Sequence, residues 1–511
     1  MRTNPDKINR VVSAETIALL HSEGLIDPLT LRNETVASLA KEPLVSARVV
    51  TGMVRTIEGL LIGLTGLALA LYYPGFGPMA EPALYFPVLT GVALLLPLLA
   101  HMLGLYRIRA LLNPGQTLSA LWACWTALFG TLAVTLILTK AGVEFSRLWL
   151  LGWYIGGLSV LLASRAVTAL LVRNWNVNGR LDRHAVLVGG GKPAAELIDA
   201  LEGSHNTDVS IVGIFDDRDD ERSPLVVHNL PKLGNIAELV EFVRRARIDL
   251  LLVTLPLTAE QRLLDILKRL WVLPVDIRLS AYTQKLHYRP RAYSYIGNVP
   301  FLDVFDKPLG DWGAIIKAIE DKVIATLALL ALSPVMLIIA LAIKLESRGP
   351  VLFRQKRYGF NNELIEVLKF RSMYHEQTDA EASKLVTKGD SRVTRVGRFI
   401  RKTSLDELPQ FINVLRGELS LVGPRPHATK AKAADRLYND VVDGYFARHK
   451  VKPGITGWAQ INGWRGETDT TEKLQRRVDH DLYYIENWSL AFDLYILWKT
   501  PLSLLKTESA Y

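Results

Sequence analysis

Four long apolar stretches dominate the first third of this 511-residue chain. They lie at about 56–73, 84–105, 117–139 and 148–172. Each is close to the roughly 20 residues that an α-helix needs to cross the hydrocarbon core of a bilayer. The pattern therefore predicts a bundle of four transmembrane helices over 55–173, after a mostly polar N-terminal segment, 1–54. The alternative is a set of helices buried inside a large soluble protein.

Basic residues indicate how these helices are oriented. Arg48 and Arg55 precede the first stretch and Arg173 follows the fourth, whereas the loop YYPGFGPMAEPA after the first stretch has no Lys or Arg. Loops on the cytoplasmic side of a membrane carry an excess of these residues. We therefore expect both ends of the bundle, and the N-terminal segment, on the cytoplasmic side, although Lys140 in the third loop weakens the pattern.

The character of the chain changes at residue 183. As far as residue 300, short apolar runs such as HAVLVGGG and VSIVGIFDD alternate with charged helical patterns such as KPAAELIDALEG. Buried strands that alternate with amphipathic helices are typical of a parallel α/β sheet. We therefore predict a Rossmann-like domain over 183–300.

A glycine turn follows the first strand of this predicted domain. Gly189, Gly191 and Ala194 have the spacing G-x-G-x-x-A, which lets a backbone turn approach a pyrophosphate at the start of a helix. Asp216 or Asp217 follows at about the distance of a ribose-binding acid. Gly189 and Gly191 are thus candidates for nucleotide binding. The alternative is a tight turn in a domain that binds nothing.

A fifth apolar segment opens the last part of the chain. Residues 323–343 are long enough to span a membrane, but Ser333 and Pro334 interrupt them, and proline removes a backbone donor. Lys and Arg flank both ends, so the charge rule places both ends on one side. We predict a break at this point and a re-entrant helix over 319–345, within a C-terminal domain over 315–511. A kinked fifth transmembrane helix is the alternative.

Basic motifs follow this segment. They are GPVLFRQKRYG at 349–359 and EVLKFRSM at 366–373. Arg binds phosphate oxygens by paired hydrogen bonds and Lys binds them as a point charge, although basic residues beside a membrane also contact anionic headgroups. The net charge of the chain is +9. In a membrane protein this charge favours lipid headgroups and phosphorylated substrates, rather than nucleic acid, as partners.

The run RKTSLDELPQFINVLRGELSLVGPRP sets two carboxylates, Asp406 and Glu407, side by side. Ser404 and Glu407 match a capping box at the start of a helix. A helix that begins nearer Pro409 is the alternative, because proline is tolerated in a first turn. In both cases the adjacent carboxylates point in different directions. One can attack phosphorus while the other holds a divalent cation.

Together these motifs resemble those of the bacterial polyisoprenyl-phosphate hexose-1-phosphate transferases. These are the large monotopic phosphoglycosyl transferases that start exopolysaccharide or O-antigen repeat units. The resemblance rests on Ser333-Pro334, KFRSM at 369–373, the run at 401–426 and VKPGITGWAQINGW at 451–464. It implies transfer of hexose 1-phosphate from a UDP-hexose, with glucose expected before galactose, to undecaprenyl phosphate with release of UMP.

The resemblance also implies roles for individual residues. Asp406 matches the nucleophile that forms a covalent phosphosugar aspartate, and Glu407 matches its partner carboxylate, associated with Mg²⁺. Ser333 and Pro334 match the break that makes the helix re-entrant, which would keep the catalytic domain on the cytoplasmic face of the bacterial inner membrane. Four basic residues lie in the active-site motifs, and we expect them to bind phosphate: Lys369, Arg371, Arg401 and Arg425.

Two other classes of protein are weighed against this one. A membrane-bound nucleotide-sugar dehydratase or epimerase would combine similar domains, but the Tyr-x-x-x-Lys pairing of Tyr495 and Lys499 lies in the apolar tail. A non-enzymatic scaffold for polysaccharide assembly would catalyse no transfer. We also expect a homodimer, because so large a non-catalytic half needs a role.

Overall fold

The structure is a computed structural model, and it falls into two compact units. One contains the described residues before Arg183 and the other those from Arg183 onward, and each unit is considered by itself. The description covers residues 45–72, 82–177, 180–204, 209–218, 223–228, 230–256, 259–281, 294–297, 299–375, 390–427, 432–433, 436–437, 445–464 and 470–506.

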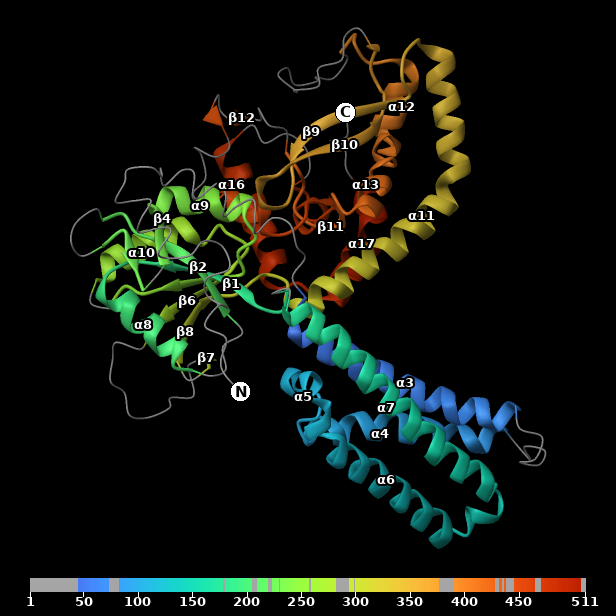
Figure 1. The fold of residues 1–511 in the computed structure, drawn as a ribbon. Helices are drawn as coiled ribbons and strands as arrows, with labels where there is room; N and C mark the ends of the chain where they lie inside the picture. The colour runs from blue at the N-terminus through green and yellow to red at the C-terminus, as the bar shows by residue number, and fades with distance from the viewer. Residues whose placement is uncertain are drawn as a thin grey trace. The chain divides into compact units, whose positions relative to one another are not determined.

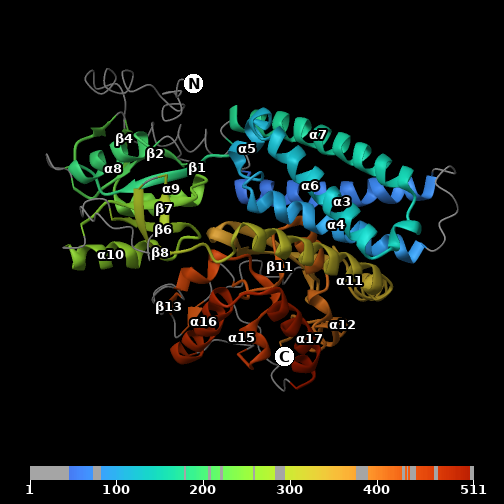
Figure 2. The same ribbon diagram turned by 90° about the horizontal axis from the view of Figure 1, so that it is seen from below.

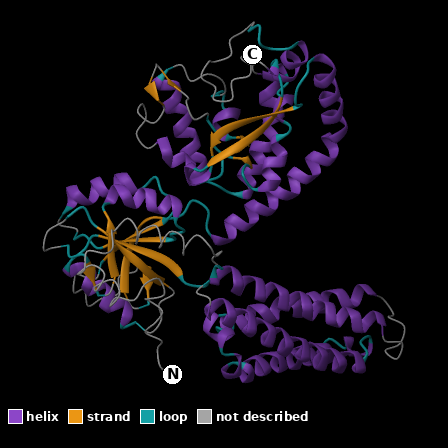
Figure 3. Ribbon diagram, turned by 45° about the horizontal axis from the view of Figure 1, so that its top comes forward, coloured by secondary structure: helices purple, strands orange, loops and turns teal. Residues whose placement is uncertain are grey.

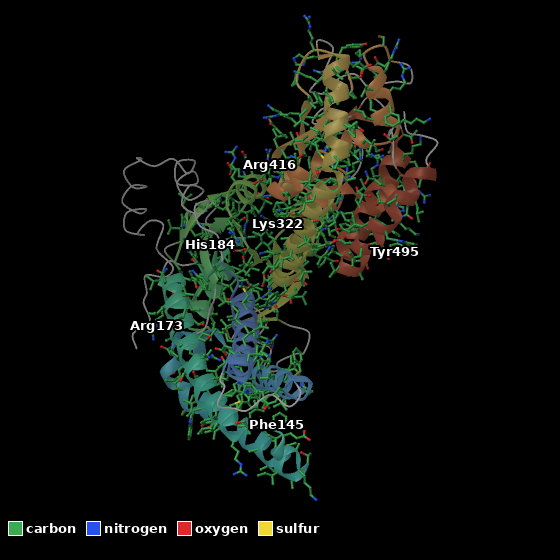
Figure 4. The ribbon with its side chains drawn as sticks, turned by 90° about the vertical axis from the view of Figure 1, so that its right-hand side faces the viewer. Phe145, Arg173, His184, Lys322, Arg416 and Tyr495 are labelled. Atoms are coloured by element: carbon green, nitrogen blue, oxygen red, sulfur yellow. The ribbon has the colours of Figure 1, made fainter. Side chains whose placement is uncertain are left out.

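Long apolar helices form the first unit (Figure 1). They are α3 (Ala47–Tyr72), α4 (Pro82–Met102), α6 (Leu118–Leu138) and α7 (Arg147–Val177), joined by α5 (Ile108–Leu112), η3 (Pro114–Gln116) and η4 (Ala141–Val143). Phe145 and Arg173 mark opposite ends of α7 (Figure 4). These four helices and α11 in the second unit are the described helices long and apolar enough to cross a membrane. Each of the four overlaps one of the predicted stretches.

Buried polar contacts tie these helices together. The indole of Trp149 donates to the carbonyl of Gly66 at 2.9 Å. Arg165 Nε lies 2.8 Å from Glu58 Oε1, and the Tyr106 hydroxyl donates to Glu58 Oε2 at 2.7 Å. A charge in apolar surroundings is tolerated when it is paired and hydrogen-bonded in this way. The pair therefore accounts for an arginine inside the apolar stretch of α7.

The second unit begins with an eight-stranded sheet of the described residues (Figure 3). Its strands are β1 (Arg183–Val188), β2 (Val209–Phe215), β3 (Val226–Val227), β4 (Leu230–Gly234), β5 (Leu250–Val253), β6 (Asp276–Ser280), β7 (Ser294–Ile296) and β8 (Val299–Phe305). The order is β3-β4-β2-β1-β5-β6-β8-β7. The central strands β4 to β6 are parallel, and the outer pairs are antiparallel.

Helices cover both faces of this sheet. They are α8 (Lys192–Glu202), α9 (Ile236–Arg245) and α10 (Glu260–Leu270), with α8 and α10 on opposite sides (Figure 2). Alternate residues of β1 face different layers: Val186 packs in the cluster with α9 and α10, and Leu187 packs with α8. The parallel core, in the order β4-β2-β1-β5-β6, matches five of the six strands of the Rossmann order 3-2-1-4-5-6. The predicted α/β character is confirmed, and the sheet continues to Phe305.

The remaining elements form a mixed domain. They are α11 (Asp311–Glu346), β9 (Leu352–Tyr358), η5 (Phe360–Asn362), β10 (Leu364–Phe370), α12 (Arg395–Lys402), η7 (Leu405–Glu407), α13 (Gln410–Arg416), β11 (Ser420–Val422), β12 (Lys432–Ala433), β13 (Arg436–Leu437), η8 (Tyr445–Lys450), β14 (Gly454–Thr456), α15 (Trp458–Ile461), α16 (Thr471–Glu486) and α17 (Leu490–Lys506). β9 pairs with β10 antiparallel, and β11 pairs with β14 parallel.

Helix α11 contains the Ser333-Pro334 pair and remains one helix from Asp311 to Glu346. Its axis bends along its length (Figure 1). The Ser333 hydroxyl donates to the carbonyl of Leu330 at 2.9 Å, so a side chain satisfies a backbone acceptor next to the proline. The expected break is therefore a bend within a continuous helix. Whether α11 re-enters or crosses the membrane stays a prediction.

Candidate active site

The two adjacent carboxylates lie on a short 3-10 turn. Ser404 adopts a left-handed conformation with φ of 58° and makes no capping hydrogen bond, so the predicted capping box is wrong. The turn η7 follows, and α13 begins after Pro409. Proline has no N–H to donate in a helix that starts at Ser404, which explains why the chain makes one tight turn and then begins a new helix. Asp406 and Glu407 thus stand at the mouth of α13.

Two cations converge on Glu407 from distant parts of the chain. Lys369 Nζ, from β10, lies 2.9 Å from Glu407 Oε1. Arg425 Nη2, from the segment after β11, lies 2.7 Å from the same oxygen, and its Nη1 lies 3.5 Å from Oε2. All three side chains are largely buried. The structure therefore brings the predicted residues Lys369, Arg425 and Glu407 together.

The environment separates the two carboxyl groups electrostatically. Burial acts to raise the pKa of Glu407, but the charges of Arg425 and Lys369 outweigh it and hold that pKa well below the ordinary range. Burial also raises the pKa of Asp406, where the charge of Lys369 opposes the rise and that of Glu407 adds to it. Glu407 is therefore the carboxylate that the site stabilises more strongly as an anion, and Asp406 is the less stabilised of the two.

Asp406 also differs from Glu407 in its contacts. Its carboxylate makes no hydrogen bond with any residue that the structure describes, and the side chain is half-buried. Arg401, at the end of α12, is close enough for its charge to lower the pKa of Asp406, but donates no hydrogen bond within the described residues. The effect of Arg401 on Asp406 is therefore one of charge at a distance.

Arg371 lies elsewhere. Its guanidinium donates to the carbonyls of Ser347 and Arg348 at 2.8 and 3.0 Å and to the Ser347 hydroxyl at 2.9 Å. These atoms follow the C-terminus of α11, where backbone carbonyls need donors. Gly349 has φ of 121°, and a Cβ there would lie 2.2 Å from Arg371 Nη1. The structure thus places Arg371 as a cap on α11 and does not bring it to the pair of carboxylates Asp406 and Glu407, hereafter the dyad.

Arg357 is a residue of this site that the sequence reasoning did not single out. It donates to the carbonyl of Pro426 at 2.5 Å and to Gln355 Oε1 at 2.7 Å, so it holds the segment that carries Arg425. Burial lowers the pKa of Arg357 to about 10, and the charge of Arg425 adds to this effect. Strand alternation is the signal that could have found it, because Gln355 and Arg357 share a face of β9 while Arg354 lies on the other.

Close backbone packing fixes the position of Arg425. The amide of Gly423 donates to the carbonyl of Thr456 at 2.9 Å, and the amide of Gly454 donates to that of Pro424 at 3.0 Å. A Cβ on Gly454 would lie 2.1 Å from the Gly423 nitrogen. Arg448 donates to the Arg425 carbonyl at 3.0 Å. The glycines of the GPRP and VKPG motifs therefore let two strands approach and aim Arg425 at the dyad.

The oxygen atoms of Asp406 and Glu407 are possible ligands for Mg²⁺. This ion prefers oxygen ligands and is often held by one or two carboxylates, with water and substrate phosphates completing its octahedron. No group of three or more His, Cys, Asp or Glu ligands occurs among the described residues. Within the part of the chain that the structure describes, the oxygens of Asp406 accept no hydrogen bond, and Glu407 Oε2 has only the long contact to Arg425. These residues fit an ion that is completed by a bound diphosphate.

The glycine turn of the α/β domain has the expected backbone. Gly189 and Gly191 have φ of 103° and 77°, which favour glycine. The Gly190 amide donates to Asp216 Oδ2 at 2.8 Å, and Arg218 pairs with the same oxygen at 2.7 Å. Asp216 therefore binds the turn itself and is not free for a ribose. A cavity of about 640 Å³ adjoins the turn, lined by Gly190, Gly191, Lys192, Pro193, Ala195, Arg218, Pro224, Val226, Val227 and His228.

Two segments of the chain match families of known proteins. Residues 312–507 match the family of bacterial sugar transferases, and residues 101–281 match a family described as a CoA-binding domain. The first match contains Lys369, the dyad and Arg425. The chain is therefore a membrane-associated, multidomain α/β protein with a transferase domain at its C-terminal end.

Three relatives extend the comparison. An Escherichia coli K12 protein named UDP-glucose:undecaprenyl-phosphate glucose-1-phosphate transferase is 40% identical over 71% of this chain and 76% of its own length. A Xanthomonas campestris protein of the same name is 34% identical over 77% of this chain and 81% of its own length. A Komagataeibacter xylinus undecaprenyl-phosphate glucose phosphotransferase is 39% identical over 68% of this chain, but only 64% of its own length is matched. The chain belongs to the bacterial sugar transferase family and is a sugar-phosphate transferase.

Proposed function

We propose that this enzyme transfers glucose 1-phosphate from UDP-glucose to undecaprenyl phosphate and releases UMP. The names of the three relatives supply the two substrates. The observation that carries the proposal is the contrast within the dyad. Glu407 is paired with Lys369 and Arg425, while Asp406 has no hydrogen-bonding partner among the described residues. A carboxylate kept free beside a cluster of cations is suited to attack a diphosphate.

The first step is attack by Asp406 on the β-phosphorus of UDP-glucose. A carboxylate oxygen forms a bond to this phosphorus, and the bond from the phosphorus to the bridging oxygen breaks. The bridging oxygen and its electron pair leave with UMP, and glucose 1-phosphate remains on Asp406 as an acyl phosphate. The attacking group is already an anion, so this step needs no general base.

The second step uses the same site in reverse. A phosphate oxygen of undecaprenyl phosphate attacks the phosphorus on Asp406, and the bond from the carboxylate oxygen to phosphorus breaks. The products are undecaprenyl-diphosphate-glucose and the free Asp406 carboxylate. A covalent intermediate lets a soluble donor and a lipid acceptor occupy one site in turn, so ping-pong kinetics should follow.

The cations of the site have separate tasks in this proposal. Lys369 and Arg425 keep Glu407 ionised, and their remaining N–H groups would donate to the oxygens of a bound diphosphate. Arg401 stabilises the Asp406 carboxylate. Mg²⁺ held by Glu407 would neutralise charge that spreads over the phosphate oxygens. Phosphoryl transfer depends mostly on such positioning and neutralisation.

Topology completes the proposal. We infer that α3, α4, α6 and α7 cross the bacterial inner membrane as a bundle and that α11 enters and leaves on the cytoplasmic side. The bend at Ser333-Pro334 and the basic residues at both ends of α11 support this arrangement. UDP-glucose would then reach Asp406 from the cytoplasm, and undecaprenyl phosphate would reach it from the leaflet.

The nucleotide product tests the reaction. Purified protein in nanodiscs is incubated with Mg²⁺, undecaprenyl phosphate and UDP-glucose, or UDP-galactose in a parallel reaction, and the nucleotide is identified by mass spectrometry. We expect UMP, formed faster from UDP-glucose. UDP would indicate an ordinary glycosyltransferase. A modified sugar still attached to UDP would indicate a dehydratase or epimerase, and no product would favour a scaffold.

A further inference from the structure

Strand β10, which carries Lys369, has a second edge that no described strand covers. β10 pairs with β9 along one edge, and this sheet has two strands among the described residues. Every second residue of a strand turns its backbone N–H and C=O groups to the same edge, so half of these groups on β10 need partners from elsewhere. The amide of Leu368 and the carbonyl of Glu366 are two of them.

The side-chain amide of Asn413 meets both groups. Its Oδ1 accepts a hydrogen bond from the Leu368 amide at 2.9 Å, and its Nδ2 donates to the Glu366 carbonyl at 2.7 Å. A carboxamide carries the donor and the acceptor of a peptide group, so one side chain takes the place of a neighbouring strand. Nδ2 also donates to Glu418 Oε2 at 2.5 Å, and the residue is completely buried. Its loss would leave buried backbone groups without these partners.

Asn413 belongs to the helix that follows the dyad. It is the fourth residue of α13, after the turn η7 that carries Glu407. On the strand, the backbone amide that it accepts directly precedes Lys369. Val414 of α13 and Val367 of β10 pack in one hydrophobic cluster beside this contact. The carboxamide therefore ties the strand that supplies the lysine to the helix that follows the glutamate.

We propose that Asn413 is a positioning residue for the reaction, whose carboxamide holds β10 against α13 and so sets the distance between the Lys369 ammonium and the Glu407 carboxylate. The hydrogen bonds of its side chain go to groups other than these two, so it acts through Lys369. The distance that it sets is 2.9 Å, and a displacement of about 1 Å in an active site is enough to lower a rate strongly. This inference rests on the proposed role of the Lys369–Glu407 pair and deepens it.

A double-mutant cycle in kcat/KM separates positioning from a general loss of packing. Asn413→Leu removes the carboxamide at nearly constant volume. In the unmodified enzyme it should lower kcat/KM for UMP release, per folded protein, on the order of tenfold or more. In the Lys369→Met background the further loss should be less than about twofold, because the group that Asn413 positions is absent. A residue with a merely structural role would cost the same factor in both backgrounds, and that result would overturn the proposal.

Tyr484→Phe is the matched control for the loss of a buried polar contact. The Tyr484 hydroxyl lies 2.8 Å from Asp493 Oδ1 and 3.0 Å from the carbonyl of Val422, and the residue is buried. Its replacement should change kcat/KM by the same factor with Lys369 present or absent. A factor that also vanishes in the Lys369→Met background would contradict the proposal, because the cycle would then not be specific to Asn413.

The free energy of unfolding supplies the cycle where Lys369→Met turns over too slowly to measure. Asn413→Leu and Lys369→Met together should lower this free energy by clearly less than the sum of the single losses, because the first change already weakens the ion pair. Tyr484→Phe and Lys369→Met should be additive. Additive losses for Asn413 and Lys369 would overturn the proposal. Should Asn413→Leu fail to fold, Asn413→Ala replaces it, because the smaller side chain leaves space for water at the freed backbone groups.

A distance measurement tests the positional claim without the reaction. Cys124 is the one cysteine in the chain, so Glu366→Cys and Arg416→Cys in a Cys124→Ser background place spin labels at exposed positions of β10 and α13. The distribution of distances between the labels should shift or broaden in Asn413→Leu and stay unchanged in Tyr484→Phe. An unchanged distribution in Asn413→Leu would sink the inference whatever nucleotide the enzyme releases. A product other than UMP would instead refute the proposed function and leave this measurement intact.

Discussion

The ammonium group of Lys369 lies 2.9 Å from Oε1 of Glu407 and joins β10 to the turn that carries Asp406. Arg425 approaches the same oxygen at 2.7 Å. Glu407 therefore meets two cations while its neighbour meets none at hydrogen-bonding distance among the described residues. The pairing explains how two carboxylates that are adjacent in sequence differ in charge stabilisation, and it leaves an excess of positive charge for a diphosphate.

The coupling free energy between Lys369 and Glu407 can be measured by a double-mutant cycle. Glu407→Gln should lower the free energy of unfolding by on the order of 3 kcal/mol, because it leaves the buried charges of Lys369 and Arg425 without their carboxylate. Lys369→Met should lower it by less, because Arg425 still pairs with Glu407. The double variant should lose clearly less than the sum. The exposed pair of Arg354 and Glu366, 3.4 Å apart, is the matched control and should couple by less than about 1 kcal/mol. Additive losses at Lys369 and Glu407 would contradict the assigned pairing.

The pH dependence of turnover should report Asp406. Attack needs the deprotonated carboxylate, and burial with the nearby charge of Glu407 raises its pKa. Activity should therefore fall, as the pH is lowered, at a higher pH than the ordinary aspartate value of about 3.9 allows. Glu407, whose pKa is held well below its usual range, stays charged through this fall.

The Glu407→Gln variant tests the sign of this effect. It removes the neighbouring negative charge and frees Lys369 and Arg425 to act on Asp406, so the acid limb of kcat/KM should move to lower pH, at reduced overall activity. The Arg354→Met variant, on the exposed face of β9, should keep the limb unchanged. A limb that moves to higher pH in Glu407→Gln would contradict the electrostatic account.

Removal of divalent metal should abolish transfer. EDTA should stop UMP release, and excess Mg²⁺ should restore it, because the dyad is expected to hold an ion that bridges to the diphosphate. The Glu407→Gln variant should need about tenfold more Mg²⁺ or more for half of its own maximal rate. Full activity in EDTA, or an unchanged Mg²⁺ requirement in this variant, would remove Glu407 as a metal ligand.

Labelling from one side of the membrane tests the topology of α11. Single cysteines in a Cys124→Ser background replace Trp312 and Leu345, which lie near its two ends and are 41% and 79% exposed. A membrane-impermeant maleimide should label both in inverted vesicles and neither in spheroplasts. Arg476→Cys in the catalytic domain is the control for the cytoplasmic side. Labelling of the two positions from opposite faces would show that α11 crosses the membrane.

Sequence pattern predicted the elements best where the signal is long. The four apolar stretches and the alternating α/β segment became helices and a mostly parallel sheet, because length and periodicity report burial directly. Short sequence motifs predicted the local structure less well. The S-x-x-E spacing at Ser404 indicated a capping box, but the missing N–H of Pro409 shifted the helix start.

The site itself depended on contacts that no local pattern contains. Lys369 and Arg371 stand two residues apart in one motif, yet Lys369 reaches Glu407 and Arg371 caps α11. Strand β10 ends at Phe370, so alternation no longer fixes the direction of Arg371. The role of Asp216 was missed for a similar reason, because its partner, the Gly190 amide, lies on a neighbouring strand end.

Trapping the intermediate tests the central claim most directly. Purified enzyme is mixed with UDP-glucose and Mg²⁺ in the absence of undecaprenyl phosphate, quenched and digested, and the peptide that contains Asp406 is examined by mass spectrometry. We predict that this peptide gains the mass of a glucose phosphate, that undecaprenyl phosphate removes it, and that Asp406→Asn shows neither the adduct nor turnover. Turnover without an adduct on Asp406, or substantial turnover by Asp406→Asn, would contradict the account.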